Sequence, residues 1–499
     1  MELQTSVYHN NSDVALAENI VPLCALAKGL EEAGEFESAV ETLSLFWSGP
    51  VSRPQISGLT DAAKAELLLR SGTLTGWVGS AKQIPGAQEA AKDLISESVA
   101  LFEGLGVPEK VAEARVDLAI CYWREGALDE ARVTLRHVLE SFGEMHSEQR
   151  LRALLNSAIV EKVATREREA LKIYRQASDL FASSSNHALK GKFHNSHATL
   201  LRSLGTSENR EDYIDNALVE YAAASYHFER AGHRRFQARV ENNVGYLFAT
   251  LRRFDDAHEH LTRARMLHLS VGDRGGAAGA EDTRAQAFLM EGKYEEAEKA
   301  SRAAVRSLTV GGEQAILAEA LTTYATALAR IREFQLAKTT LDQAVEIART
   351  VGNPDRGGIA AVTAIEELSS YLSLESLHAY YSMAESLLSK SQNRSLKTRL
   401  GECARRVLAA EFASLKSNTQ TTDLPAMPPG FSLDAEVLRY EGSLIRKALE
   451  DSGGSVTRAA RQLGVTHQGL AFILNGRHND LLSIRTPVKK RRRSIIRNH

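Results

Sequence analysis

The chain has 499 residues, which is too many for one compact core, so several domains or a repeat array are expected. Apolar residues make up 43% and charged residues 25%, as in globular proteins. The three cysteines are far apart in the sequence and form no CxxC pair, which argues against a disulfide framework or a zinc finger. The net charge of −2 is uneven, because residues 434–499 carry +7 and the rest of the chain carries −9, which favours phosphate binding by the C-terminal part alone.

The N-terminal segment has no targeting pattern. The first residues, MELQTSVYHNNSDVALAENI, contain no basic stretch followed by an apolar one, so no secretory signal is predicted. No apolar run approaches the roughly 20 residues that span a bilayer. We expect residues 1–14 to be disordered and the protein to be cytoplasmic, without a membrane partner.

From residue 15 the chain shows a repeat of about 40 residues. A small residue follows a larger apolar one by three positions, as in Tyr294 and Ala297, and again 40 residues later in Phe334 and Ala337. This key position falls at Ala39, Ala91, Ala131, Ala170, Ala217, Ala257, Ala297, Ala337 and, in degenerate form, Leu377. A second alanine often follows seven residues on, which makes one stripe of a helix. Gly232, Gly272, Gly312 and Gly352 keep the same spacing, so each repeat is predicted to be two helices followed by a glycine turn.

The array resembles the tetratricopeptide repeat (TPR). Gly245, Phe254, Ala257 and Ala264 match the family pattern of a small residue in the first helix, an aromatic residue before the key alanine, and a second alanine after it. The period of 40 exceeds the family's 34, and the Pro that commonly closes a repeat is missing. HEAT-like repeats remain the lesser alternative. The resemblance implies an all-α fold, a TPR-like α-solenoid of about nine helix pairs with a groove that binds a protein or peptide.

Residues 15–413 are assigned to this solenoid, with residues 391–413 as a capping helix. Residues 414–433 are polar and contain Pro425, Pro428 and Pro429, and are predicted to be a linker.

The solenoid shows little catalytic chemistry. It has no GxxxxGK[ST] phosphate-binding loop, and we expect no enzyme activity, no cofactor and no metal. The histidine pairs His194 with His197 and His258 with His260 are interpreted as solvated helix faces rather than metal ligands. Cys121, on an apolar face, is predicted to be a core residue.

Residues 434–480 are predicted to form a small helical DNA-binding domain. A helix over 443–451 ends at Gly453-Gly454, a second helix covers 456–463, and a third begins after Thr466. Ala460 allows close helix approach, Gly464 allows a tight turn, and Val465 with Leu470 is expected to lock the third helix onto the second. This spacing is that of a helix-turn-helix.

The run GGSVTRAARQLGV resembles the C-terminal DNA-binding segment of the Fis family, over roughly 440–474. By that resemblance Ser455 and Thr457 face phosphate, whereas Thr466, His467 and Gln468 face base edges in the major groove. Ala471, Phe472 and Ile473 stand where Fis-type helices carry basic residues, so the basic tail 481–499 is expected to supply charge. Phe472 is expected either to pack on another helix or to touch a thymine methyl. The full set of predicted DNA-binding residues is Ser455, Thr457, Arg458, Thr466, His467, Gln468, Asn475, Arg477, Lys489, Lys490, Arg491, Arg492 and Arg493.

These features predict a transcriptional regulator that binds double-stranded DNA as a homodimer, with Leu444, Ile445, Leu449 and Phe472 as candidates for the pairing surface. The alternative is a TPR scaffold whose basic tail docks on acidic protein or RNA.

Overall fold

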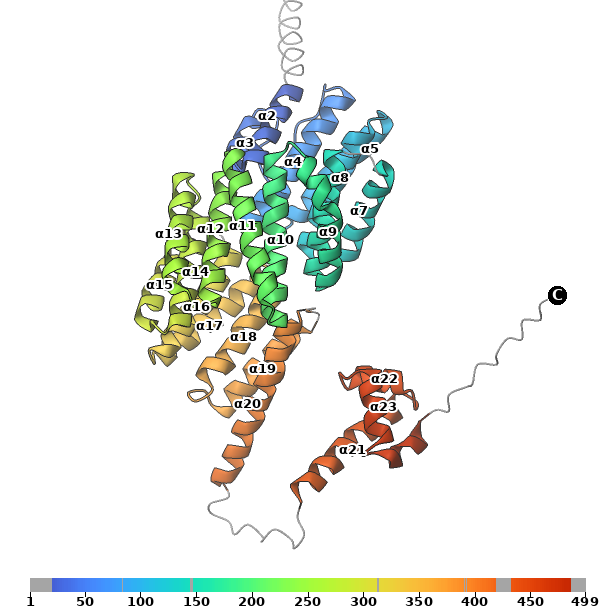
Figure 1. Cartoon of the computed structure of the whole chain (residues 1–499), viewed down its shortest axis with the longest axis vertical. Helices are drawn as coiled ribbons and strands as arrows, with labels where there is room; N and C mark the ends of the chain where they lie inside the picture. The colour runs from blue at the N-terminus through green and yellow to red at the C-terminus, as the bar shows by residue number, and fades with distance from the viewer. Residues whose placement is uncertain are drawn as a thin grey trace, which may run out of the picture. The chain divides into compact units, whose positions relative to one another are not determined.

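The computed structural model describes residues 20–82, 84–143, 147–311, 314–389, 391, 393–418 and 432–485. The regular elements in these ranges are all helical. The chain divides between Glu411 and Phe412 into two compact units, called here the body and the C-terminal unit (Figure 1). The predicted disordered segment 1–14 and most of the predicted linker lie outside the described residues.

The described part of the body consists of nine helix pairs and one further helix, as predicted. The pairs are α2 (Ile20–Ala33) and α3 (Phe36–Thr42), α4 (Asp61–Lys82) and α5 (Ala87–Gly104), α6 (Pro108–Glu125) and α7 (Leu128–Phe142), α8 (Glu148–Val163) and α9 (Glu167–Ser183), α10 (His187–Glu208) and α11 (Glu211–Arg230), α12 (Arg234–Thr250) and α13 (Phe254–Ser270), α14 (Arg274–Glu291) and α15 (Tyr294–Gly311), α16 (Gln314–Arg330) and α17 (Phe334–Thr350), and α18 (Pro354–Leu368) and α19 (Leu374–Leu388), followed by α20 (Arg394–Asn418).

The packing order makes the body a solenoid. From α2 to α19 each helix packs against the next, and the first helix of each pair also contacts the first helix of the following pair, from α2 and α4 through α16 and α18. The first helices therefore form a continuous inner layer, and the second helices lie outside it, as in TPR-like superhelices.

The predicted key position is fully buried between helices. All eight alanines at this position have 0% exposure, and Leu377 has 2%. The alanines seven residues on are also buried, from Ala177 to Ala384. Because a buried alanine allows two helices to approach closely, the alanine pattern directly reflects the spacing of the helices.

Left-handed residues end both helices of a pair. Gly232, Gly272 and Gly352 between repeats have φ values of 67–70°, as the glycine spacing predicted. The turns inside pairs use the same conformation: Gly126 and Gly292 occupy it in two pairs, and Arg252 and Arg332, with φ of 61° and 69°, in two others. A residue with a Cβ adopts this conformation at a cost, so glycine is favoured at these turns but is not required.

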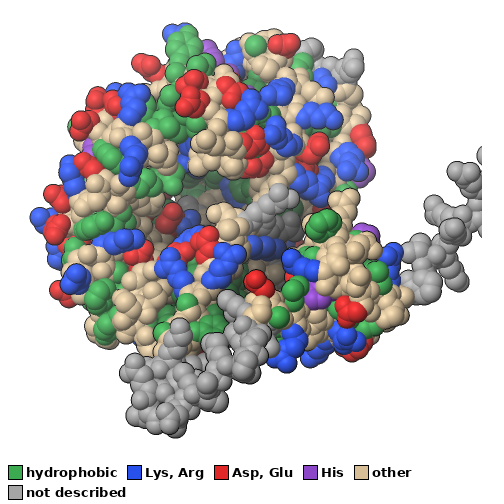
Figure 2. Space-filling view, turned by 60° about the horizontal axis from the view of Figure 1, so that its bottom comes forward, with side chains coloured by type: hydrophobic (Ala, Val, Ile, Leu, Met, Phe, Trp, Pro, Cys, Tyr) green, Lys and Arg blue, Asp and Glu red, His purple; other side chains and the backbone are tan. Residues whose placement is uncertain are grey.

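The first helix pair touches the sixth. A Cβ on Gly34, which ends α2, would lie 2.3 Å from Cε1 of His233, which precedes α12. Glu37 of α3 and Arg235 of α12 form an ion pair of 3.3 Å between residues 198 apart. Figure 1 shows α2 and α3 beside α11 at one end of the body. The solenoid therefore curves back on itself, and Figure 2 shows a hollow inside the ring of helices.

The capping helix is displaced relative to its predicted range of 391–413. It runs from Arg394 to Asn418, so its last turn enters the segment predicted as linker. Cys403 and Val407 are buried against the preceding pairs, whereas Leu408 and Phe412 are 51% and 65% exposed.

Candidate DNA interface

The C-terminal unit contains the predicted helix-turn-helix. Its elements are α21 (Leu433–Asp451), α22 (Val456–Gln462), α23 (His467–Asn475) and the short 3-10 helix η2 (Asn479–Ile484). α21 begins ten residues before the predicted helix start at 443. Nine residues form the core: Ile445, Ala448, Leu449, Val456, Ala459, Ala460, Leu470, Leu474 and Leu481. The core therefore extends into η2, beyond the predicted boundary at residue 480.

Two glycine turns set the angles between the three helices. Gly453 and Gly454, with φ of 61° and 75°, end α21, and the Gly454 N–H donates to the Leu449 carbonyl at 2.7 Å. Gly464, with φ of 68°, ends α22. These hydrogen bonds and left-handed residues are the usual way to close a helix and reverse the chain, as the sequence pattern predicted.

The expected role of Val465 is wrong. Its side chain is 42% exposed and does not lock α23 onto α22. Its backbone N–H instead donates to the Ala460 carbonyl at 2.9 Å and completes the turn. Leu470, at 1% exposure, makes the predicted apolar contact because it lies one turn inside α23 and faces the core.

The predicted base-contacting residues lie at the start of α23. Thr466 is the N-cap, and its hydroxyl accepts a hydrogen bond from the Gly469 N–H at 3.0 Å. His467 and Gln468 follow as the first two residues of the helix, and both side chains are exposed. Asn475, the last residue of α23, is also exposed. The start of the third helix therefore presents polar groups to solvent, where a recognition helix meets base edges.

The predicted phosphate-contacting residues lie at the start of α22. Ser455 is its N-cap, is half-buried, and makes no side-chain capping hydrogen bond. Thr457 and Arg458 are exposed in the first turn. The predicted residues Lys489, Lys490, Arg491, Arg492 and Arg493 lie outside the described residues.

The side chain of Arg477 is fixed by an ion pair within its own unit. Its guanidinium forms an ion pair with Glu441 of α21, whose second oxygen lies 2.8 Å from Nε2 of the buried His478. These hydrogen bonds, the one from Arg477 first, lower the pKa of Glu441. The three residues connect α21 to the segment before η2. No local pattern in the sequence indicated this contact, because it joins residues 36 and 37 positions apart.

The proposed pairing surface needs correction. Ile445 and Leu449 are 4% and 0% exposed and belong to the core of their own unit, so they are not available to a second copy. Leu444 and Phe472 are 45% and 82% exposed. The longer α21 carries two further exposed apolar residues ahead of the predicted helix, Val437 at 58% and Tyr440 at 69%. With Leu444 they recur at spacings of three and four and form one apolar stripe.

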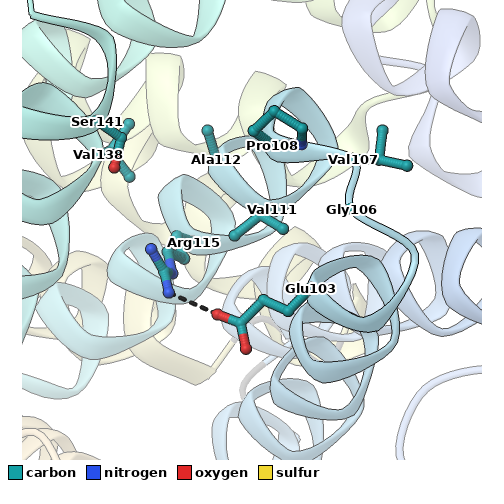
Figure 3. A pocket seen from close by; sticks show the side chains of 9 residues that line it. All are labelled: Glu103, Gly106, Val107, Pro108, Val111, Ala112, Arg115, Val138 and Ser141. Atoms are coloured by element: carbon teal, nitrogen blue, oxygen red, sulfur yellow. Dashed lines mark hydrogen bonds and ion pairs between the residues drawn. The ribbon is translucent and has the colours of Figure 1, made fainter.

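One cavity in the described part of the body is mainly apolar. A cavity of about 320 Å³ lies beside the turn between α5 and α6 (Figure 3). Val107, Pro108 and Val111 line it, and its only ion pair, Glu103 with Arg115 at 2.6 Å, is satisfied internally. An apolar hollow without convergent polar groups does not indicate chemistry.

The four histidines predicted to lie on solvated helix faces are instead half-buried and contact carboxylates. His194 and His197 both contact Glu220 of α11, at 2.6 and 3.2 Å. His258 and His260 contact Glu291 and Glu241, at 3.1 and 2.8 Å. The reason is that each lies at a helix–helix seam, where a carboxylate from the neighbouring helix reaches it. Within the described ranges no three His, Cys, Asp or Glu side chains are placed to hold a metal ion.

Cys121 is buried, as predicted, and burial raises the pKa of its thiol to about 12. None of the helices in the described ranges combines the length and apolar character that crossing a bilayer requires.

Comparison with known proteins agrees with these geometries. Residues 439–471 match the family model described as "Bacterial regulatory protein, Fis family". A search of curated proteins finds no match to the chain.

Three solved structures illustrate the similarity of the body. A Rap protein complexed with competence and sporulation factor is 13% identical, with a TM-score of 0.47 over 71% of this chain and 99% of that chain. Yeast Tom70 is 14% identical, with a TM-score of 0.46 over 84% and 86%. A tetratricopeptide repeat protein from Parabacteroides merdae is 16% identical, with a TM-score of 0.40 over 60% and 98%. Scores this low carry no argument about function. The chain thus joins a TPR-like helical-repeat body to a helix-turn-helix of the Fis type.

Proposed function

We propose that this protein is a DNA-binding transcriptional regulator that acts without catalysis. The observation that carries the proposal is the Fis-type helix-turn-helix, whose third helix presents His467 and Gln468 to solvent at its first turn. Gln pairs bidentately with adenine and His donates to guanine acceptors, so this turn is suited to direct base readout. In this proposal Ser455, Thr457 and Arg458 contact phosphate, and Lys489 to Arg493 add sequence-independent attraction.

The body is proposed to be the sensor. Its inner layer of first helices provides a surface for a protein or peptide, and occupancy of that surface would change the placement or pairing of the C-terminal units. Pairing is proposed to use the stripe of Val437, Tyr440 and Leu444 on α21. A two-fold dimer would read two half-sites about one helical turn of DNA apart.

The competing function is a scaffold whose basic tail docks on acidic protein or RNA. The uneven charge, −9 in residues 1–433 and +7 in residues 434–499, is compatible with both roles. A preference among DNA sequences separates them, because a charged tail alone binds all duplexes alike.

The experiment is a selection of bound DNA fragments with the full-length protein, followed by binding measurements on the preferred and a random duplex at several salt concentrations. His467→Ala with Gln468→Ala should weaken binding to the preferred duplex by roughly 1–3 kcal/mol and affect the random duplex much less. Replacing Lys489 to Arg493 with Ala should weaken both equally and reduce the slope of log K against log salt by about 0.9 per lost phosphate contact.

The matched control replaces Lys172 and Arg175, two exposed cations on α9, with Ala, and should change neither duplex affinity. Equal losses on both duplexes for the 467 and 468 variant would remove α23 as the reader. Absence of any sequence preference in the unaltered protein would favour the scaffold.

A further inference from the structure

Four cations on the inner layer of the body have no carboxylate partner among the described residues. They are Lys162 on α8, Lys192 and Arg202 on α10, and Arg239 on α12. The three helices are consecutive first helices, and each contacts the next. On α4 of the same layer, by contrast, Arg70 is paired and contacts Glu31 at 3.0 Å and Glu113 at 2.7 Å. Arg124 on α6 has no carboxylate partner in the described structure either and lies over the ring of Trp77, 3.9 Å from its centroid, so unpaired cations extend from α6 to α12.

Lys162, Lys192 and Arg202 are half-buried, whereas Arg239 is exposed. Burial lowers the pKa of Lys162 to about 8, and the nearby Arg202 lowers it further. Burial also lowers the pKa of Lys192 and of Arg239. Nε of Arg202 is buried and has no hydrogen-bond partner in the described structure. Unpaired cations in such surroundings cost free energy and are more common at binding sites than at structural positions.

Two of the three carboxylates that act on Lys192 are held by arginines. Glu31 pairs with Arg70, and Asp117 pairs with Arg152. Lys192 and Arg239 instead approach the ring of Phe236, each at 5.3 Å from its centroid. These contacts leave the charges of Lys192 and Arg239 without a counter-ion from the chain.

The arrangement indicates the form of the missing anion. Lys192 and Arg239 gather around Phe236, whereas Arg202 lies over the ring of Tyr246, 4.9 Å from its centroid, and interacts with Lys162. The charges thus form two groups on two different rings and do not converge on a single point. A ligand that satisfies both groups must be extended and must carry at least two separate anionic groups.

The same rings argue against a nucleic acid. Proteins that bind single strands stack bases on open aromatic faces. Here cations already lie against the rings of Phe236 and Tyr246. The charge of −9 on residues 1–433 also repels a long polyanion more than a short acidic segment.

We propose that the inner surface of α8, α10 and α12 binds an acidic peptide segment, with one carboxylate at Lys162 and Arg202 and another at Lys192 and Arg239. This surface belongs to the inner layer of first helices, in the part of the solenoid that the contact of Gly34 with His233 closes. The inference rests on the proposed sensor role of the body and names the class of its partner.

The test uses full-length protein in which Lys489 to Arg493 are replaced with Ala, so that the basic tail does not bind the probe. The probe is a fluorescein-labelled eight-residue peptide of alternating Glu and Ala, and its reference is the same peptide with Gln for Glu. We expect anisotropy to show at least tenfold tighter binding of the Glu peptide. Lys162→Gln with Arg202→Gln, and separately Lys192→Gln with Arg239→Gln, should each reduce that affinity about tenfold.

Two controls make the result specific. Lys172→Gln with Arg175→Gln removes two exposed cations from α9 and should leave peptide affinity unchanged. The inner variants should melt no lower than the parent, because each loses two charges that have no carboxylate partner. A melting temperature lowered by many degrees would indicate a structural role and overturn the proposal.

Three further outcomes would also overturn it. The first is equal binding of the Glu and Gln peptides, and the second is unchanged peptide affinity in both inner variants. The third is that an oligothymidine or inorganic phosphate binds more tightly than the Glu peptide and that the inner variants abolish this binding. Failure of the DNA selection with intact peptide binding would remove the regulator and keep this site, so the two proposals fail separately.

Discussion

At the residue scale, Asp282 on α14 carries a carboxyl group whose burial costs free energy. It is 3% exposed; one oxygen accepts hydrogen bonds from Gln286 at 2.9 Å and Thr323 at 3.3 Å, and the other has no partner in the described structure. Burial, and then the charge of Glu319, raises the pKa of Asp282 to about 7. The folded state therefore favours the protonated carboxyl.

The sign of the pH effect follows from that shift. Because the folded pKa lies above the ordinary value of 3.8, the stabilising contribution is complete below about pH 4 and is lost as pH rises through 7. Asp282→Asn should raise the free energy of unfolding by about 2–4 kcal/mol at pH 8 and change it little at pH 4. Thermal melts at pH 4, 6 and 8 measure this. Glu295→Gln, an exposed carboxylate on α15, is the control, and a lower melting temperature of the Asn variant at pH 8 would contradict the argument.

Some residue contacts can be predicted from the sequence, and others cannot. Ala337 and Ala257 were identified from their spacing, because a periodic position on a helix points to one face. The pairing of Arg477 with Glu441 was not identified, because it depends on how η2 and α21 pack. The same reason explains the error over His194 and His258, whose carboxylate partners come from other helices.

At the element scale, the C-terminal helix pairs have a core of their own. The largest apolar cluster of the body runs from Ala278 on α14 to Val407 on α20. A fragment of residues 273–418 keeps this whole cluster, including the N-cap Asp273, whose side chain accepts a hydrogen bond from the Gly276 N–H at 2.8 Å. Since repeat proteins are stabilised by contacts between neighbours, this fragment should be helical and should melt cooperatively, as followed by circular dichroism.

A substitution in the same fragment tests the alanine pattern. Ala337→Arg places a long side chain at a position of 0% exposure between two helices and should abolish the cooperative melt. Thr339→Arg, two residues on and exposed, should leave it. An unfolded parent fragment would contradict the neighbour-stacking account, and a folded Ala337→Arg fragment would contradict the packing at the key position.

At the scale of the whole molecule, the exposed apolar residues of the C-terminal unit lead to a prediction about self-association. The stripe of Val437, Tyr440 and Leu444 has no covering partner within the described part of its unit, and burial of such a stripe against a second copy would remove it from water. Tyr440→Glu with Leu444→Glu should convert the dimer to monomer in sedimentation at micromolar concentration, because it places four like charges in the interface.

The comparison variant is Phe472→Glu. Phe472 is 82% exposed on α23, away from the α21 stripe in sequence. The variant should therefore leave the dimer intact while changing DNA affinity. A dimer lost equally in both variants would move the interface to α23. A strictly monomeric unaltered protein bound to one half-site would remove the two-fold model.

The sequence by itself determined the all-helical class, the positions of the repeats and the helix-turn-helix, because periodic alanines and turn glycines act within or between adjacent helices. Local spacing also located the cap Thr466 and the left-handed Gly464. Only the tertiary structure decided which surfaces remain open: it buried Ile445 and Leu449, exposed Val437 and Tyr440, and gathered Lys162, Lys192, Arg202 and Arg239 on one inner layer. The physical reason is that exposure and charge pairing depend on residues that are distant in sequence and are brought together only when the solenoid curves and the helices pack.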